Sequence, residues 1–208
     1  LILEKSHAHI VNRKNGKLLQ SLELPDNGAS LAADPSGNWL AVGTSKGRVL
    51  VFESEEQPEF NLSGSGQLHE GAVSALLFEN EELRFFSAGT DQKLLSTHAR
   101  GTLEPEDRGR GNSHSDRVTS MLWGPNNRFF TGGSDKTVKS WPWPGNARPA
   151  TLKDGIIKVV DLALVQLNRK PHLAIFCTDA SIRIFALDEE GRFGDLVVRC
   201  NGATVTMK

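Results

Sequence analysis

The stretch RFFTGGSDKTVKSW (128–141) decides the fold class of this chain. In it, an apolar run leads into small residues and a Ser-Asp-Lys turn, and a second run ends in a tryptophan. Three other stretches have the same layout: WLAVGTSKGRVLVF (39–52), RFFSAGTDQKLLST (84–97) and HLAIFCTDASIRIF (172–185). Each predicts two β-strands around a tight turn, because β-branched and aromatic residues favour strands and Gly, Asp and Ser favour turns.

The four turns recur at a nearly constant spacing. Aligning them places Lys46, Asp91, Asp135 and Asp179 at equivalent positions, which are 45, 44 and 44 residues apart. This period matches the roughly 40–45 residues of one four-stranded propeller blade. A strand-like stretch also precedes each hairpin: ASLAAD (29–34), AVSALLF (72–78), RVTSMLW (117–123) and IIKVVDLALV (156–165). A more polar outer strand follows the hairpins, so each unit predicts four strands.

The repeat extends over nearly the whole chain and predicts an all-β fold, a β-propeller of four-stranded antiparallel blades without long helices. We expect one propeller domain over 1–208, with five blade units: 1–26, 27–68, 69–113, 114–154 and 155–200. The first unit lacks its first strand, and 201–208 could supply it as a closing strand beside Leu1–Ser6. The chain could then form a closed five-bladed ring, although a sector of a larger ring is favoured. The start at a leucine leads us to expect a longer parent protein.

The composition is that of an ordinary globular protein. Among 208 residues, Lys+Arg number 24 and Asp+Glu 25, which gives a net charge of −1. So small a charge offers no general attraction to a phosphate backbone or an anionic membrane. Two cysteines, Cys177 and Cys200, are too few for a disulfide framework, and no apolar run reaches the roughly 20 residues that span a bilayer. We expect a cytoplasmic protein, or a nuclear one in a eukaryote, without membrane association.

A set of polar residues marks the unit at 114–154. It consists of Ser113-His114, Thr131, Asp135 and Trp141. The set resembles the most regular form of a WD40 repeat, which carries Gly-His, a serine or threonine, an aspartate and a tryptophan. The resemblance implies a hydrogen-bonded chain that runs from the aspartate through the histidine and the hydroxyl to the indole N–H, so that buried polar groups have partners. It therefore implies a structural role for these side chains.

The other units keep this set only in part. The unit at 69–113 keeps three members and has a threonine at the tryptophan position: His69, Ser87, Asp91 and Thr97. The unit at 27–68 has Lys46 at the aspartate position, and the unit at 155–200 has no histidine before its first strand. No unit ends in the Trp-Asp dipeptide of the family. The chain is therefore identified as a divergent member of the WD40-repeat family.

No motif in the sequence predicts a catalytic residue, a cofactor or a metal site. His7 and His9 share one face of a strand, but no CxxC, HExxH or third ligand accompanies them. Gly64-Ser-Gly66 lacks the Gly-Lys-Ser/Thr of a phosphate loop. A hydrolase built on a propeller would need carboxylates or metal ligands around the central channel, and no such ring of residues is recognisable.

The resemblance implies that the surface left for function is the face on which the loops before each blade and the hairpin turns meet. Loops on a rigid scaffold are where binding residues concentrate. Five residues next to the signature residues are expected there: Glu70, Thr90, Asp116, Arg117 and Ser134. Arg117 is the strongest candidate, because arginine is enriched at binding hot spots and forks two hydrogen bonds to a carboxylate.

We therefore expect a non-catalytic scaffold or adaptor that docks partner proteins or peptides within a larger complex. The alternative is a nucleic-acid-associated subunit of a complex. In that case Arg108 and Arg110, in the polar loop at 104–112, would contact phosphates, and binding would weaken steeply with added salt.

Overall fold

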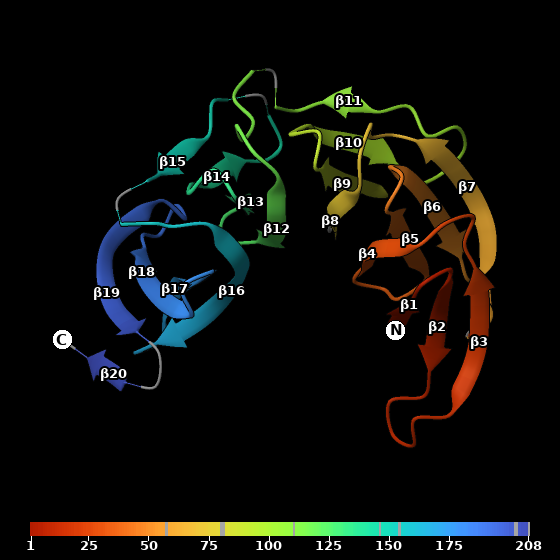
Figure 1. Cartoon of the computed structure of the whole chain (residues 1–208), viewed down its shortest axis with the longest axis horizontal. Helices are drawn as coiled ribbons and strands as arrows, with labels where there is room; N and C mark the ends of the chain where they lie inside the picture. Colours follow the sequence, from red (N-terminus) through yellow and green to blue (C-terminus); the bar gives the residue numbers. More distant parts are fainter. Residues whose placement is uncertain are drawn as a thin grey trace. The chain divides into compact units, whose positions relative to one another are not determined.

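All regular secondary structure is β-strand in the part of the chain that this computed structural model describes, namely residues 1–56, 58–79, 82–109, 111–145, 147–153, 155–201 and 204–207. The strands form five antiparallel sheets, which confirms the all-β prediction (Figure 1). No helix among these residues has the length and hydropathy needed to cross a membrane. The chain divides into two compact units, Leu1–Ser113 and His114–Lys208. A single domain over 1–208 stays a prediction. Each unit is described by itself.

Unit 1 contains three sheets whose strands pair in chain order. The first sheet has three strands: β1 (Ile2–Glu4), β2 (His7–Val11) and β3 (Leu18–Glu23). The second has four: β4 (Gly28–Ala33), β5 (Trp39–Thr44), β6 (Arg48–Glu53) and β7 (Asn61–Gln67). The third also has four: β8 (Val73–Phe78), β9 (Arg84–Gly89), β10 (Leu94–His98) and β11 (Glu106–Asp107).

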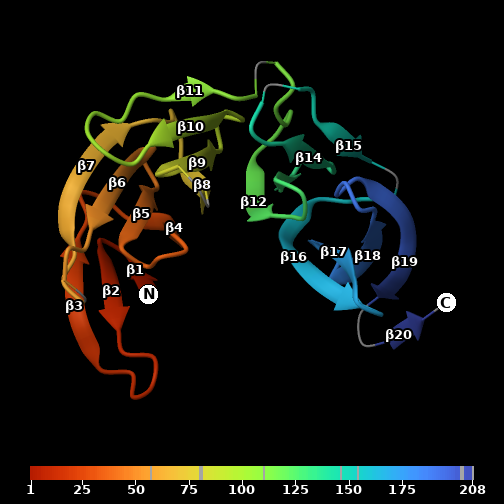
Figure 2. The ribbon, with the colours of Figure 1, turned by 180° about the vertical axis from the view of Figure 1, so that it is seen from behind.

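Unit 2 contains two sheets, which Figure 2 shows from behind. One comprises β12 (Val118–Trp123), β13 (Arg128–Gly133), β14 (Val138–Pro142) and β15 (Ala150–Leu152). The other has a fifth strand and comprises β16 (Val159–Leu167), β17 (Lys170–Cys177), β18 (Ser181–Leu187), β19 (Phe193–Asn201) and β20 (Thr204–Met207).

The strand β20 has a different partner from the one that the sequence suggested. Its backbone pairs with β19, with Val198 opposite Met207 and Asn201 opposite Thr204. The sequence had offered 201–208 as a closing strand beside Leu1–Ser6, which in this structure pairs through β1 with β2. Pairing with the preceding strand closes only a short loop, and so costs little chain entropy.

The hairpins that carry the repeat form the core of each unit. All six residues of β5 are buried, as are the last five of β9 and the last five of β13. Phe85 and Phe86 of β9 and Phe130 of β13 are fully buried, and Phe129 is almost so. The outer strands are much more exposed, for example β3 and β7. This gradient explains why the inner strands are almost continuously apolar and the outer ones polar.

Small residues in these hairpins let neighbouring sheets approach closely. A Cβ atom added to Gly43 of β5 would lie 2.6 Å from Cβ of Val73 on β8. In unit 2, a Cβ atom on Gly132 of β13 would lie 2.5 Å from Cγ1 of Val159 on β16. Both distances are shorter than any real contact between carbon atoms, so the two positions need glycine.

Hydrogen bonds from side chains also join neighbouring sheets within each unit. Ser30 Oγ donates to the carbonyl of Val73 at 2.8 Å, and Ser120 Oγ donates to Asp161 Oδ1 at 2.6 Å. At the outer strands, Gln20 Nε2 donates to the carbonyl of Phe60, whose N–H donates to Gln20 Oε1, both at 2.8 Å. The amide of Gln20 thus satisfies both backbone groups of Phe60.

Candidate functional site

The four aligned turns have the same backbone geometry. The residue after each aligned position has a positive φ: Gly47 (89°), Gln92 (68°), Lys136 (65°) and Ala180 (58°). In the three turns with an aspartate, its Oδ1 accepts a hydrogen bond from the backbone N–H two residues later, at 3.0–3.2 Å. Asp favours such turns because its side chain bonds its own backbone in this way.

A buried chain of hydrogen bonds ties the turn at Asp135 to the middle of its sheet. Nδ1 of His114 lies 2.9 Å from Asp135 Oδ1, and Nε2 lies 2.7 Å from Thr131 Oγ1. Trp141 Nε1 donates to the same hydroxyl oxygen at 2.9 Å. With Nδ1–H donating to the carboxylate, the Thr131 hydroxyl donates to Nε2 and accepts from the indole, so every group has a partner. His114, Thr131 and Trp141 are all buried.

Asp135 receives further hydrogen bonds that keep it ionised. Thr137 Oγ1 donates to its Oδ1 at 2.8 Å, and the backbone N–H of Ser115 donates to its Oδ2 at 3.0 Å. Burial on its own would raise the pKa of Asp135, but the hydrogen bonds from His114, Thr137 and Ser115 outweigh it and hold the pKa well below the ordinary value. The loop before β12 is therefore fixed to the turn after β13.

The equivalent chain in the sheet of β8 to β11 is shorter. His69 Nδ1 lies 2.9 Å from Asp91 Oδ1, and Nε2 lies 2.9 Å from Ser87 Oγ. Burial lowers the pKa of His69, against the opposing effect of Asp91, so the ring is held neutral. Thr97 stands opposite Phe85, as Trp141 stands opposite Phe129, so a threonine occupies the position of the tryptophan. The series of hydrogen bonds therefore ends at Ser87 and has no indole.

Two further contacts escaped the sequence analysis. In the sheet of β4 to β7, where Lys46 replaces the aspartate, Asp26 of the preceding loop accepts from the Lys46 backbone N–H and from Ser45 Oγ, both at 3.2 Å. The carboxylate is therefore supplied by the loop before the sheet instead of by the turn. The Pro-Asp-Asn-Gly sequence at 25–28 is the only signal for it.

In the sheet of β16 to β20, which has no such histidine, a buried arginine lies near the aspartate of the turn. Arg183 of β18 is 3% exposed, donates to Cys177 Sγ at 2.9 Å and lies 3.7 Å from Asp179 Oδ2. An arginine at an inward position of an apolar strand was the signal that could have indicated this contact.

The five residues expected to bind partners lie beside these buried chains. In unit 1, Glu70 and Thr90 are exposed; the backbone N–H of Glu70 donates to Asp91 Oδ2 at 3.1 Å, and its carboxylate pairs with Lys93 at 2.8 Å. In unit 2, Asp116 and Arg117 are exposed and Ser134 is half-buried. The N–H of Ser134 donates to the carbonyl of Arg117 at 2.8 Å, which fixes the two loops to each other.

The loop that suggested nucleic-acid binding has a structural explanation. The side chain of Arg108 is 14% exposed; its Nη2 pairs with Glu106 Oε2 at 2.7 Å and its Nε donates to Ser96 Oγ at 2.9 Å. These bonds hold the guanidinium against its own sheet. Arg110 lies outside the described residues. Within the described part of the chain, no group of three or more His, Cys, Asp or Glu could hold a metal ion.

Comparison with protein families supports the assignment made from the repeat. A family model described as "WD domain, G-beta repeat" matches residues 108–142, which contain the complete hydrogen-bonded chain. The fold is that of a WD40-type propeller, and the match shows that residues 108–142 are similar to a WD40 repeat.

Two curated relatives have names from ribosome assembly. The pre-rRNA-processing protein IPI3 of Yarrowia lipolytica is 28% identical over 183 residues, which are 84% of this chain and 41% of that protein. The ribosome biogenesis protein WDR12 homolog of Chlamydomonas reinhardtii is 28% identical over 178 residues, which cover 73% and 39%. The chain thus spans less than half the length of these relatives.

Solved structures confirm the propeller fold. Sqt1 of Chaetomium thermophilum, bound to the N-terminus of the ribosomal protein L10, aligns with a TM-score of 0.69 at 21% identity and covers 96% of this chain and 56% of that one. A chain of the mitotic checkpoint complex aligns with a TM-score of 0.76 at 18% identity and covers 98% and 60%.

Proposed function

We propose that this chain is a non-catalytic protein-interaction scaffold that docks a partner protein during ribosome assembly. The observation that carries the proposal is the position of Arg117 and Asp116, which are exposed beside the buried chain of His114, Asp135 and Trp141. Because the hydrogen-bonded chain fixes the loop, a partner binds to charges that are already in place. Little conformational entropy is therefore lost on binding.

The same geometry argues for binding and against catalysis. The histidines and aspartates of the two buried hydrogen-bonded chains hold each other and the backbone: His114 is 3% exposed and His69 is 2% exposed. A general base must reach the proton of a substrate, and these rings are enclosed by their own sheets. Three of the exposed residues beside them, Glu70, Asp116 and Arg117, are charged and suited to an ionic interface.

The names of the relatives support a role in ribosome assembly. Two of them are named for pre-rRNA processing and ribosome biogenesis, and one structural neighbour binds the N-terminus of a ribosomal protein. We propose that the partner is a protein of the assembling ribosome, that an acidic segment of it contacts Arg117, and that the chain works in the nucleus as well as the cytoplasm of a eukaryotic cell.

The test is capture of assembling ribosomal particles by the tagged chain from its own cells, with contact sites mapped by cross-linking and mass spectrometry. Arg117→Glu is expected to reduce capture at least tenfold, because it places like charges in contact. Arg169→Glu is the matched control, because Arg169 is also exposed and lies in the turn between β16 and β17. That turn is at the opposite end of its sheet from the turn between β17 and β18, which contains Asp179 and corresponds to the turn at Asp135. Melting temperatures should stay unchanged in both.

The proposal fails if Arg117→Glu and Arg169→Glu capture equally well, or if the intact chain captures no ribosomal precursor. Capture that disappears after ribonuclease treatment, with cross-links to RNA alone, would instead establish the nucleic-acid-associated subunit.

A further inference from the structure

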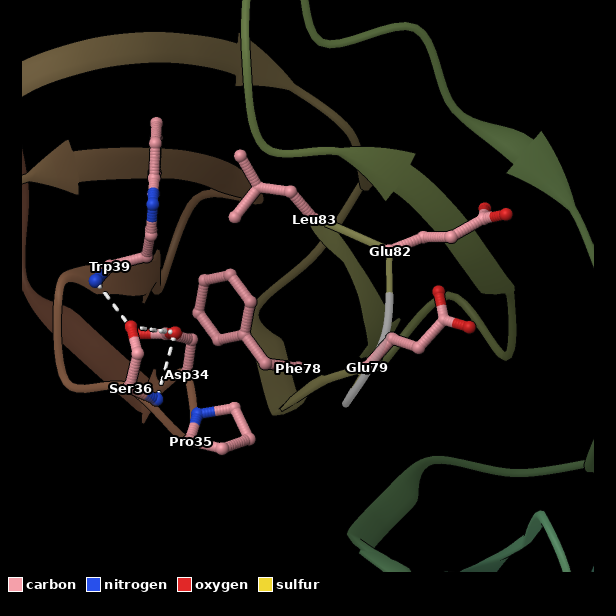
Figure 3. A pocket seen from close by; sticks show the side chains of 8 residues that line it. All are labelled: Asp34, Pro35, Ser36, Trp39, Phe78, Glu79, Glu82 and Leu83. Carbon is pink, nitrogen blue, oxygen red and sulfur yellow. Dashed lines mark hydrogen bonds between the residues drawn. The ribbon is translucent and has the colours of Figure 1, made fainter.

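A cavity of about 470 Å³ opens in unit 1 between the turn that joins β4 to β5 and the turn that joins β8 to β9 (Figure 3). One wall comes from the first turn and the start of β5 and consists of Asp34, Pro35, Ser36 and Trp39. The other comes from the end of β8 and the second turn and consists of Phe78, Glu79, Glu82 and Leu83. In Figure 3, Phe78 and Leu83 point toward Trp39 across the space.

This cavity lies away from the proposed docking residues. β8 pairs with β9 from Val73 opposite Gly89 at one end to Phe78 opposite Phe85 at the other. Glu70 and Thr90 lie beyond the first end, whereas Glu79 and Glu82 lie beyond the second. The cavity is therefore a separate surface, and its role does not depend on the proposed function.

The lining combines aromatic and aliphatic walls with negative charge. Three carboxylates line it, and among the described residues no Lys or Arg does. Glu79 is only 9% exposed, so its carboxylate acts in a region of low dielectric constant, where a cation is attracted more strongly than in water. Glu82 contributes less, because it is exposed and already lies 3.4 Å from Arg84 Nε.

Asp34 adds a second fixed charge. Its Oδ1 accepts from the backbone N–H of Trp39 at 2.8 Å, and its Oδ2 accepts from the backbone N–H of Ser36 at 3.0 Å and from the Ser36 hydroxyl. Burial opposes ionisation, but these hydrogen bonds outweigh it and lower the pKa of Asp34. The carboxylate is therefore ionised at neutral pH and held in place by the turn.

Trp39 already binds a guanidinium within the chain. The Cζ atom of Arg100 lies 5.3 Å from the centre of the Trp39 ring, and its Nη2 pairs with Glu53 Oε1 at 2.7 Å. Arginine stacks on aromatic rings and forks hydrogen bonds to carboxylates at once, which a compact ammonium or a metal ion does not do. The cavity offers the same two kinds of group, and its carboxylates do not form a metal-holding cluster among the described residues.

We propose that this cavity binds an arginine side chain of a partner protein, with its stem against Phe78 and Leu83 and its guanidinium at Glu79 and Asp34. The cavity volume is within the roughly 300–1,000 Å³ of small-ligand sites, so there is room for the side chain together with its own backbone. The cavity is thus a second docking surface, for a basic segment.

The test titrates the ¹⁵N-labelled full chain with N-acetylarginine amide and follows the indole signal of Trp39, which Trp39→Phe identifies. The neutral isostere N-acetylcitrulline amide is the matched probe, and it is expected to bind at least tenfold more weakly. Glu79→Gln should weaken arginine binding about tenfold, which is the loss of one charge-assisted hydrogen bond. Glu104→Gln removes an equal charge from an exposed position outside the cavity and should change nothing.

Equal binding of the two probes, or no movement of the Trp39 signal with either, would overturn the proposal. If Glu79→Gln lowers the melting temperature, the comparison of the two probes on the unsubstituted chain still decides the matter. Arg117→Glu should leave arginine binding unchanged, so this test and that of the proposed function can fail separately.

Discussion

Replacing Thr131 with valine tests the hydrogen-bonded chain of unit 2 with almost no change of side-chain shape. Thr131 is completely buried, and its hydroxyl contacts both His114 Nε2 at 2.7 Å and Trp141 Nε1 at 2.9 Å. Valine fills the same space and therefore leaves no large cavity. It does leave the imidazole nitrogen and the indole N–H buried without their partner.

The expected cost follows from that count of broken bonds. A buried polar group without a partner costs about 1–3 kcal/mol, so two such groups predict a loss of roughly 2–6 kcal/mol in the free energy of unfolding. Ser87→Ala in unit 1 breaks only the bond to His69 Nε2, so it should cost about half as much. The difference between the two losses in the free energy of unfolding therefore measures how much the hydrogen bond from the Trp141 indole contributes.

The assay is urea unfolding followed by tryptophan fluorescence. Three of the four tryptophans, Trp123, Trp141 and Trp143, lie in unit 2, while Trp39 reports on unit 1. The midpoint should fall while the urea dependence stays the same, because the surface exposed on unfolding does not change. Thr151→Val at an exposed position of β15 is the control, with an expected change within about 0.5 kcal/mol. If Thr131→Val matches Thr151→Val, the hydrogen-bonded chain does not stabilise the unit and the reasoning is wrong.

Three further predictions concern the same buried groups. Trp141→Ala should cost about 3–5 kcal/mol, measured by the same urea experiment, because it removes a large buried ring; a loss below about 1 kcal/mol would place the ring outside the core. The carboxylate of Asp135 has a lowered pKa in the folded chain, so its contribution is present above the ordinary value of 3.8 and lost as the pH falls below it. Melting curves between pH 3 and 7 should therefore show the difference between Asp135→Asn and the unsubstituted chain shrinking at the acid end, and a constant difference would contradict this. Burial lowers the pKa of His69 from 6.5, so the unfolded chain takes up the proton first and unit 1 should lose stability as the pH falls below 6.5, seen in Trp39 fluorescence; His69→Gln should remove that loss, and an unaltered pH profile would refute the assignment.

The sequence predicted the strands and turns because they depend on local chemistry. The turn at Asp135 requires a hydrogen-bond acceptor at one residue and a positive φ at the next. Both requirements restrict the residue types within a short stretch, so they can be recognised in the sequence. The repeat of that signature then located the hairpins at 84–97 and 128–141. The fold class was predictable because the repeated strands β5, β9 and β13 are buried almost throughout and are therefore largely apolar on both faces.

The contacts that escaped prediction join residues whose relation appears only in the folded chain. Asp26 serves a turn 20 residues further on, and Arg183 reaches across its own hairpin to Cys177. The cavity beside Trp39 needs two turns that are about 44 residues apart in sequence. The partner of β20 was also missed, because an alternating run shows that a strand forms and not which strand edge it joins.

The paired hydrogen bonds between Gln20 and Phe60 bear on how unit 1 unfolds. Repeated sheets behave as a row of elements, each with its own stability and a coupling to its neighbour. The Gln20 amide contributes to the coupling between the first and second sheets and little to the stability of either, since both partners lie at outer strands. Its removal should leave each sheet intact and weaken the link between them, to which the apolar cluster that the two sheets share also contributes. The side chain of one residue therefore adds to the resistance of the first sheet to opening on its own.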